Sequence, residues 1–172
     1  MFDVTTLKIG PLPEALVSAS IDFATQFSVK MHETMMPASV FFTKQGRFGT
    51  VKIPVIQDPS DKNVVSQVIR DFRRDCDAVT FVAESWIVER PVNRKDPNKE
   101  DVKKMADKMF PTGIIHDEPD RKEVVMLCIY VKSRTLILTA PIERTPDKVS
   151  LGDWEVTQDS AVDSRLAGRF ID

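Results

Sequence analysis

A glutamate stands in the middle of the most strand-like run of this chain. The run FVAESWIV covers residues 81–88 and places Glu84 among aromatic and aliphatic side chains that favour strands. A carboxylate on a rigid strand could act in acid–base catalysis, bind a ligand, or form half of a buried ion pair. Because a buried carboxylate without a partner is costly, we expect an ion pair here.

Trp86 and Arg121 are the residues most able to act together with Glu84. Trp86 shares a strand face with Glu84, because side chains alternate along a strand. If the strand that begins at Arg121 pairs antiparallel with residues 81–88, Arg121 approaches Glu84 or Glu89. We therefore predict a structural pair between Arg121 and Glu84. The alternative is a binding floor that uses the carboxylate of Glu84, the ring of Trp86 and the guanidinium of Arg121.

The densest group of polar residues is IIHDEPDRKE, residues 114–123. His116, Asp117, Glu118 and Asp120 there offer an imidazole and three carboxylates. Together with Glu84 they could hold a divalent ion or carry out acid–base hydrolysis. Acidic residues beside a proline are also ordinary loop composition. We favour a solvated turn, with no metal site and no cofactor, and keep the hydrolase as the alternative.

Charge and motifs exclude several common functions. The formal net charge is −2, which argues against a dedicated nucleic-acid binder. A basic cluster within residues 94–108 is offset by neighbouring carboxylates, and local nucleic-acid contact there is a lesser hypothesis. Neither glycine-rich phosphate-binding pattern occurs. His32 begins a string like that of the metalloproteases, but Met36 stands where the second histidine would be.

The compartment is predicted from what the chain lacks. Cys76 and Cys128 have no Cys or His at metal-ligand spacing, so we expect two small buried apolar side chains and no disulfide. The first residues do not resemble a signal peptide, and no apolar run reaches the roughly 18 residues of a membrane helix. We expect a cytoplasmic protein that does not enter a membrane.

Hydrophobic periodicity predicts the elements that position these residues. Helices are expected over residues 13–36, 58–76 and 98–110, and from residue 160. A hairpin is expected over residues 39–55, and further strands over 78–88, 123–130, 135–142 and 154–157. Both faces of the strand at 78–88 are apolar, which predicts a central strand covered on both faces, or one face covered by a helix and the other by a partner chain.

These elements predict one α+β domain over residues 1–172. Its mostly antiparallel sheet should have about five to six strands, with helices packed mainly on one face. Residues 91–121 are highly charged and contain several prolines, and we interpret them as a charged insertion in this domain.

Two segments carry a resemblance to a known group. AESW at residues 83–86, followed by PDRKEVVML at residues 119–127, resembles a group of small uncharacterised bacterial and phage α+β proteins. The resemblance implies no activity and no site residue. It favours a phage or mobile-element origin.

The function predicted from the sequence is therefore a non-enzymatic one. We expect a binding or assembly protein that works through self-association, as a homo-oligomer, or through an unknown protein partner. The missing catalytic motifs, the strand that is apolar on both faces and the charged insertion favour this hypothesis over the hydrolase.

Overall fold

The computed structural model of the protein describes residues 2–30, 36–53, 59–87, 119–132 and 134–159. Its helical elements are the 3-10 turn η1 (Val4–Leu7), α1 (Pro11–Lys30) and α2 (Pro59–Asp75). Its strands are β1 (Ser39–Lys44), β2 (Arg47–Lys52), β3 (Ala78–Ile87), β4 (Lys122–Val131), β5 (Arg134–Thr145), β6 (Lys148–Leu151) and β7 (Glu155–Asp159).

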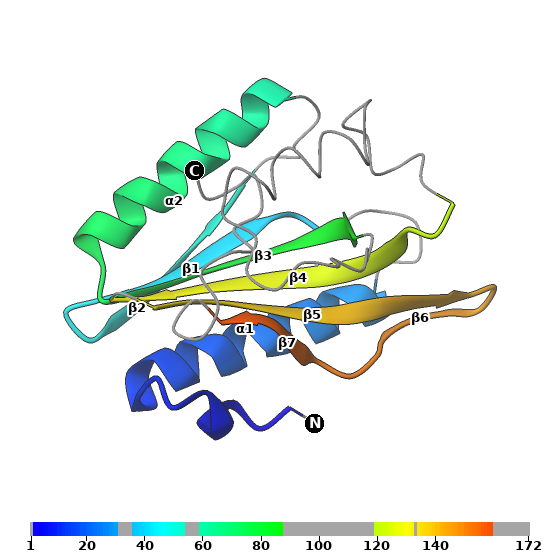
Figure 1. The fold of residues 1–172 in the computed structure, drawn as a ribbon, viewed down its shortest axis with the longest axis horizontal. Helices are drawn as coiled ribbons and strands as arrows, with labels where there is room; N and C mark the ends of the chain where they lie inside the picture. Colours follow the sequence, from blue (N-terminus) through cyan, green and yellow to red (C-terminus); the bar gives the residue numbers. More distant parts are fainter. Residues whose placement is uncertain (1, 31–35, 54–58, 88–118, 133, 160–172) are drawn as a thin grey trace, which may run out of the picture.

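The strands form one antiparallel, seven-stranded sheet in the order β2-β1-β3-β4-β5-β6, with β7 also pairing with β5 (Figure 1). The ladder between β3 and β4 runs from Ala78 opposite Val131 to Ile87 opposite Lys122. The predicted α+β class and the antiparallel sheet are confirmed, and β3 is a central strand as expected. β6 is an additional strand that the sequence did not predict.

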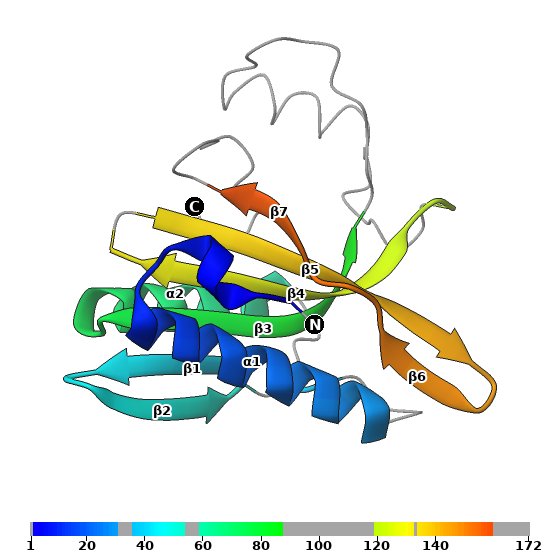
Figure 2. The same ribbon diagram turned by 90° about the horizontal axis from the view of Figure 1, so that it is seen from below.

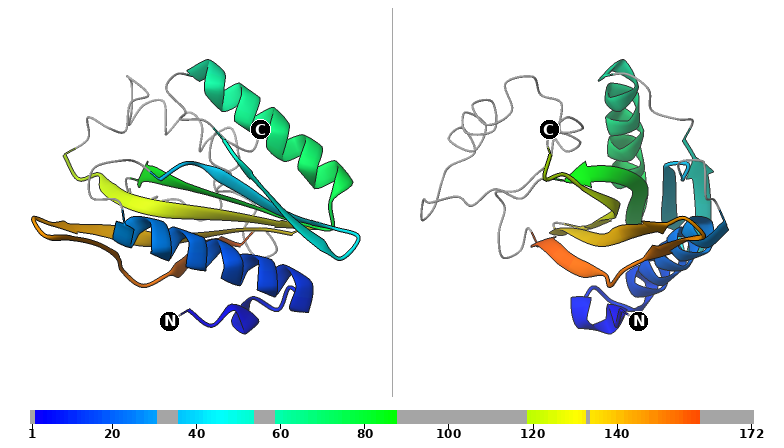
Figure 3. Two further views of the ribbon diagram at one scale, coloured as in Figure 1. Left: turned by 180° about the vertical axis from the view of Figure 1, so that it is seen from behind. Right: turned by 90° about the vertical axis from the view of Figure 1, so that its right-hand side faces the viewer.

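Each face of the sheet carries its own hydrophobic core. Val82, Val125 and Leu127 point toward α1, whereas Val79, Phe81 and Cys128 point toward α2. The two helices therefore lie on opposite sides of the sheet (Figures 1 and 3). The expectation that helices pack mainly on one face is corrected here. Alternate residues of β3 are apolar in both directions, so each face needs its own cover.

The sheet curls around α1. Ile142 of β5 and Leu151 of β6, which pair at the base of the β5–β6 hairpin, pack against the core on the α1 side (Figure 2). A buried hydroxyl contact fixes α1 to the central strand, because Ser20 Oγ lies 2.6 Å from Thr80 Oγ1. The α1-side core therefore extends to the part of the sheet that carries Glu84.

Two predicted helix boundaries change. The first helix begins at Pro11 rather than residue 13, and Met36 lies outside the helix. The second helix spans Pro59–Asp75, within the predicted range 58–76. The predicted helices at residues 98–110 and beyond residue 160 lie outside the described residues, as does most of the predicted insertion at 91–121.

The hairpin of β1 and β2 forms as predicted. Gln45 and Gly46 make its two-residue turn with positive φ angles of 51° and 72°. Two successive residues of positive φ match the turn type that suits the twist of hairpin strands. Beyond the strands, Ile53 N donates a hydrogen bond to Ala38 O at 2.7 Å. This bond fixes which backbone groups of β2 face β1.

Candidate functional site

Glu84 lies toward the end of β3, on the face that carries α1. Its carboxylate meets two elements from other parts of the chain. Met36 N, after α1, donates a hydrogen bond to Glu84 Oε1 at 3.0 Å, and Arg144 Nη2 of β5 lies 3.8 Å from Oε2. Only 8% of the Glu84 side chain is exposed. Glu84 is thus the buried, paired carboxylate that the sequence predicted, but with different partners.

Arg144 gives its hydrogen bonds to a second glutamate. Arg144 Nε and Nη2 donate to the two carboxylate oxygens of Glu123, at 2.9 and 2.6 Å. The fork of a guanidinium matches a carboxylate in this way. Glu84 therefore receives only the longer contact from Nη2. Its buried Oε2 accepts no hydrogen bond from the residues that the structure describes.

The two glutamates and the arginine form what we call the carboxylate cluster: Glu84, Glu123 and Arg144. Burial raises the pKa of Glu84, and the negative charge of Glu123 acts in the same direction. The Met36 N–H and the charge of Arg144 oppose this rise but do not cancel it. Glu84 therefore binds a proton more readily in the folded protein than in water.

Arg121 takes a different position from the one predicted. Its Cζ lies 4.9 Å from the centre of the Trp86 ring, an arrangement typical of a cation–π contact. The predicted ion pair between Arg121 and Glu84 is not found, because the cation that contacts Glu84 among the described residues is Arg144. Glu89, the other predicted partner of Arg121, lies outside the described residues. Trp86 and Arg121 do contact each other, as neighbours of the carboxylate cluster.

Sequence reasoning missed Glu123 and Arg144, although a signal for both was present. The short connection between β4 and β5 sets Val131 opposite Arg134, which fixes the register of the whole hairpin. Counting along this register places Arg144 just past the residue opposite Glu123. Both share the strand face of Glu84, because side chains alternate with period two.

The structure does not describe the rest of the predicted hydrolase site. His116, Asp117 and Glu118 lie outside the described residues. Within the described ranges, no group of three or more His, Cys, Asp or Glu side chains could hold a metal ion.

The cysteines carry no obvious nucleophile. Cys128 is buried in the α2-side core, where burial raises the pKa of its thiol to about 12. A thiol of this kind stays protonated near neutral pH and is a poor nucleophile. Cys76 is half-buried rather than fully buried as predicted, and both cysteines are free.

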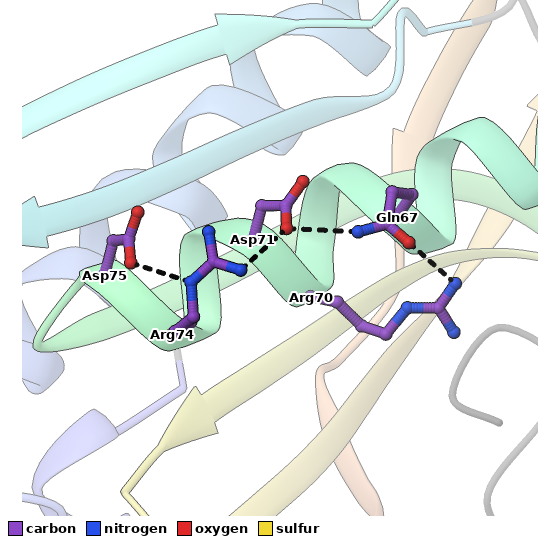
Figure 4. Close-up of polar contacts among 5 residues, drawn as sticks. All are labelled: Gln67, Arg70, Asp71, Arg74 and Asp75. Atoms are coloured by element: carbon purple, nitrogen blue, oxygen red, sulfur yellow. Dashed lines mark hydrogen bonds and ion pairs between the residues drawn. The ribbon is translucent and has the colours of Figure 1, made fainter.

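Arg70 and Arg74 of α2 contact neighbouring polar groups, as predicted, whereas Arg73 lies over the Tyr130 ring, 4.6 Å from Cζ to centroid. Arg74 contacts Asp71 at 3.4 Å and Asp75 at 3.1 Å (Figure 4). Gln67 links Asp71 to Arg70 by hydrogen bonds of 3.0 and 3.3 Å. Exposed pairs of this kind contribute little to stability.

A second candidate surface is the outer edge of the sheet at β2. No other strand of the described residues pairs with this edge, since β2 ends the strand order. Two apolar side chains project from it: Phe48 is 55% exposed and Val51 is 39% exposed. Arg47 and Lys52, also exposed, stand at its two ends.

Gly49 keeps β2 close to its neighbour. The Phe42 ring of β1 covers this glycine, and an added Cβ would lie 2.3 Å from Phe42 Cζ. The same ring packs on Phe72 of α2 with a centroid distance of 4.6 Å. The edge strand is therefore held against the α2-side core by an aromatic pair that requires glycine in β2.

Comparisons with protein-family models, with curated proteins and with solved structures gave no match. In the described part of the chain, no helix is long and apolar enough to cross a membrane.

Proposed function

We propose that this protein is a non-enzymatic binding or assembly protein that engages another protein chain at the β2 edge. The supporting observation is the exposure of Phe48 and Val51 on the strand that ends the described sheet. Apolar side chains beside backbone groups that no described strand pairs with favour the addition of a further strand.

The charges at this edge agree with a controlled interaction rather than indiscriminate aggregation. Lys and Arg on an edge strand discourage pairing between identical edges. Arg47 and Lys52 occupy such positions on β2, with Lys44 just before the turn. The β2 edge is therefore better suited to one specific partner strand than to exposed strands in general.

Binding through the edge is tested by a proline at Thr50. The Thr50 N–H points away from β1, so Thr50→Pro removes an outward donor and leaves the β1 ladder intact. Thr50→Val keeps the donor and is the matched control. Size-exclusion chromatography with light scattering measures self-association, and pull-down compares partners of the three proteins.

The proposal predicts that oligomerisation or partner capture is retained by Thr50→Val and lost by Thr50→Pro. Equal association of all three proteins would contradict a role for the edge. A strict monomer that captures no partner in a Thr50-dependent way would contradict the function itself.

The hydrolase remains a second candidate function because of the properties of the Glu84 carboxyl group. Glu84 has a raised pKa and an oxygen that accepts no hydrogen bond from the described residues, as a general acid requires. It would act with His116, Asp117 and Glu118. Hydrolysis of a nitrophenyl ester or phosphate diester, with and without Mn²⁺ or Zn²⁺, tests this. A rate that Glu84→Gln leaves unchanged would contradict the hydrolase.

Three predictions from the sequence belong to the same proposal. They are the cytoplasmic location, the phage or mobile-element origin, and a ligand-binding role for Trp86 and Arg121. The contact between these two side chains, 4.9 Å from Cζ to ring centre, supports the last of them.

A further inference from the structure

We infer that the β2 edge binds an extended peptide strand with an acidic residue at each end of the paired stretch and apolar residues between them. This inference rests on the proposed function and names the chemistry of the partner. It depends on three features of β2: the direction of its backbone groups, the order of its exposed side chains, and its charge.

The backbone of β2 offers a ladder for a new strand. Ile53 N bonds to Ala38 O, so odd-numbered positions of β2 exchange hydrogen bonds with β1. In an antiparallel pair, alternate residues direct their N–H and C=O groups to opposite sides. Phe48, Thr50 and Lys52 therefore direct theirs away from β1, toward an incoming strand.

The exposed side chains of β2 set the order of the partner's residues. Along the strand, Arg47 and Phe48 are followed by Gly49 and Thr50, and then by Val51 and Lys52. Directly opposed side chains on paired strands interact, and opposite charges or matched apolar groups stabilise the pairing. The complementary strand is therefore acidic–apolar–polar–polar–apolar–acidic. This order is the same in both directions, so it suits a parallel or an antiparallel partner.

Charge disfavours a second copy of β2 as this partner. The strand Arg47–Lys52 contains two cations and no carboxylate. In an antiparallel ladder between two β2 edges, the residues whose N–H and C=O groups point away from β1 must lie opposite one another. Two copies centred on Thr50 would therefore set Phe48 of each against Lys52 of the other. This arrangement leaves the cations of both copies along one ladder without a counter-charge.

A carboxylate-bearing strand removes both conflicts. Its acidic groups would lie opposite Arg47 and Lys52, and its apolar groups would cover Phe48 and Val51, the most exposed apolar side chains of β2. The apolar contacts supply binding free energy, and the paired charges select the partner.

Two labelled peptides test this inference with the full-length protein. One contains Glu-Val-Thr-Thr-Val-Glu and the other Lys-Val-Thr-Thr-Val-Lys, and fluorescence anisotropy measures their affinities. The acidic peptide places two attractive charge pairs across the strands, and the lysine peptide places two repulsive ones. We expect this difference in pairing free energy to give about a tenfold higher affinity for the acidic peptide. The preference should shrink as salt rises.

Two variants make the test specific to the edge. Thr50→Pro should abolish binding of the acidic peptide, and Thr50→Val should retain it. The double variant Arg47→Glu with Lys52→Glu should reverse the preference, so that the lysine peptide binds more tightly. Circular dichroism of each variant confirms that the fold is retained, and the charge-reversal result stands even if Thr50→Pro fails to fold.

The outcomes separate this inference from the proposed function. Equal binding of both peptides, or an unchanged preference after charge reversal, overturns the acidic partner while edge binding stands. If the protein self-associates in a way that Thr50→Pro abolishes but the acidic peptide does not inhibit, the partner is a second copy of the protein, and the inference is also overturned. Loss of every Thr50-dependent association overturns both.

Discussion

Arg144 Nη2 lies 3.8 Å from Glu84 Oε2, yet Arg144 donates its hydrogen bonds to Glu123. One arginine thus faces two carboxylates and donates a hydrogen bond to each oxygen of one of them. The other, Glu84, is more buried and accepts one hydrogen bond from the described residues, from Met36 N. This asymmetry explains why burial and the neighbouring charge raise the pKa of Glu84 despite a nearby guanidinium.

Replacing Glu84 should change how stability depends on pH. The pKa of Glu84 is raised above its ordinary value of 4.5 in the folded state, so folding favours its proton. The wild type therefore loses stability relative to Glu84→Gln as pH rises from 4.5 through the folded pKa. The slope of this difference is at most about 1.4 kcal/mol per pH unit.

Urea denaturation of both proteins between about pH 4 and pH 8 measures this difference. Glu143→Gln, at an exposed glutamate of β5, controls for the loss of one negative charge. A wild type that gains stability over Glu84→Gln as pH rises would contradict the raised pKa.

Removing Arg144 should expose the conflict between the two carboxylates. We expect Arg144→Met to destabilise the protein at neutral pH by about 1–2 kcal/mol, because Glu84 and Glu123 lose their shared cation. The loss should be smaller in the Glu84→Gln background, where one buried charge is already absent. A double-mutant cycle measures this coupling. Additive losses would show that Arg144 does not act on Glu84.

The hydroxyl pair of α1 and β3 should show a similar asymmetry. Ser20 Oγ lies 2.6 Å from Thr80 Oγ1 and 2.9 Å from Leu16 O, and both side chains are buried. Ser20→Ala deprives the Thr80 hydroxyl of this contact and should cost about 1–3 kcal/mol. Thr80→Val should cost less, because Ser20 keeps its bond to Leu16 O.

The double variant Ser20→Ala with Thr80→Val should then be less destabilised than the sum of the single variants. Thermal or urea unfolding measures all three. A Thr80→Val loss as large as that of Ser20→Ala would contradict a shared hydrogen bond as the cause.

Gly49 should not accept even one extra carbon. The added Cβ of Gly49→Ala would overlap the Phe42 ring, at 2.3 Å from Cζ. Such overpacking typically costs about 1–3 kcal/mol, measured by urea unfolding. Thr50→Ala, one position further along the exposed strand, is the control. Phe42→Leu should reduce the effect of Gly49→Ala, and an equal effect in both backgrounds would place the strain elsewhere.

The fold was predictable where alternation and turns decide it. The two apolar faces of β3 and the hairpin at Gln45 and Gly46 follow from local pattern. The side of the sheet chosen by each helix did not follow, because periodicity identifies a buried stripe but not what covers it.

The sequence predicted a buried carboxylate beside a cation, but it did not predict which residues are the partners of Glu84. The burial of Glu84 beside a cation follows from the cost of an unpaired carboxylate. Choosing Arg144 over Arg121 required the register of β4 and β5, and also the position of Met36 after α1. The β4–β5 register follows from the short connection between these strands, but the position of Met36 beside Glu84 is a long-range relationship that no short stretch of sequence encodes.

Backbone amide exchange of β2 tests the central claim most directly. On addition of the acidic peptide, the Thr50 N–H should become protected from hydrogen exchange. The Gly49 and Val51 N–H groups, which face β1, should change little. Saturable binding that leaves Thr50 unprotected, or that protects amides around Glu84 instead, would contradict the assignment of the β2 edge as the binding surface.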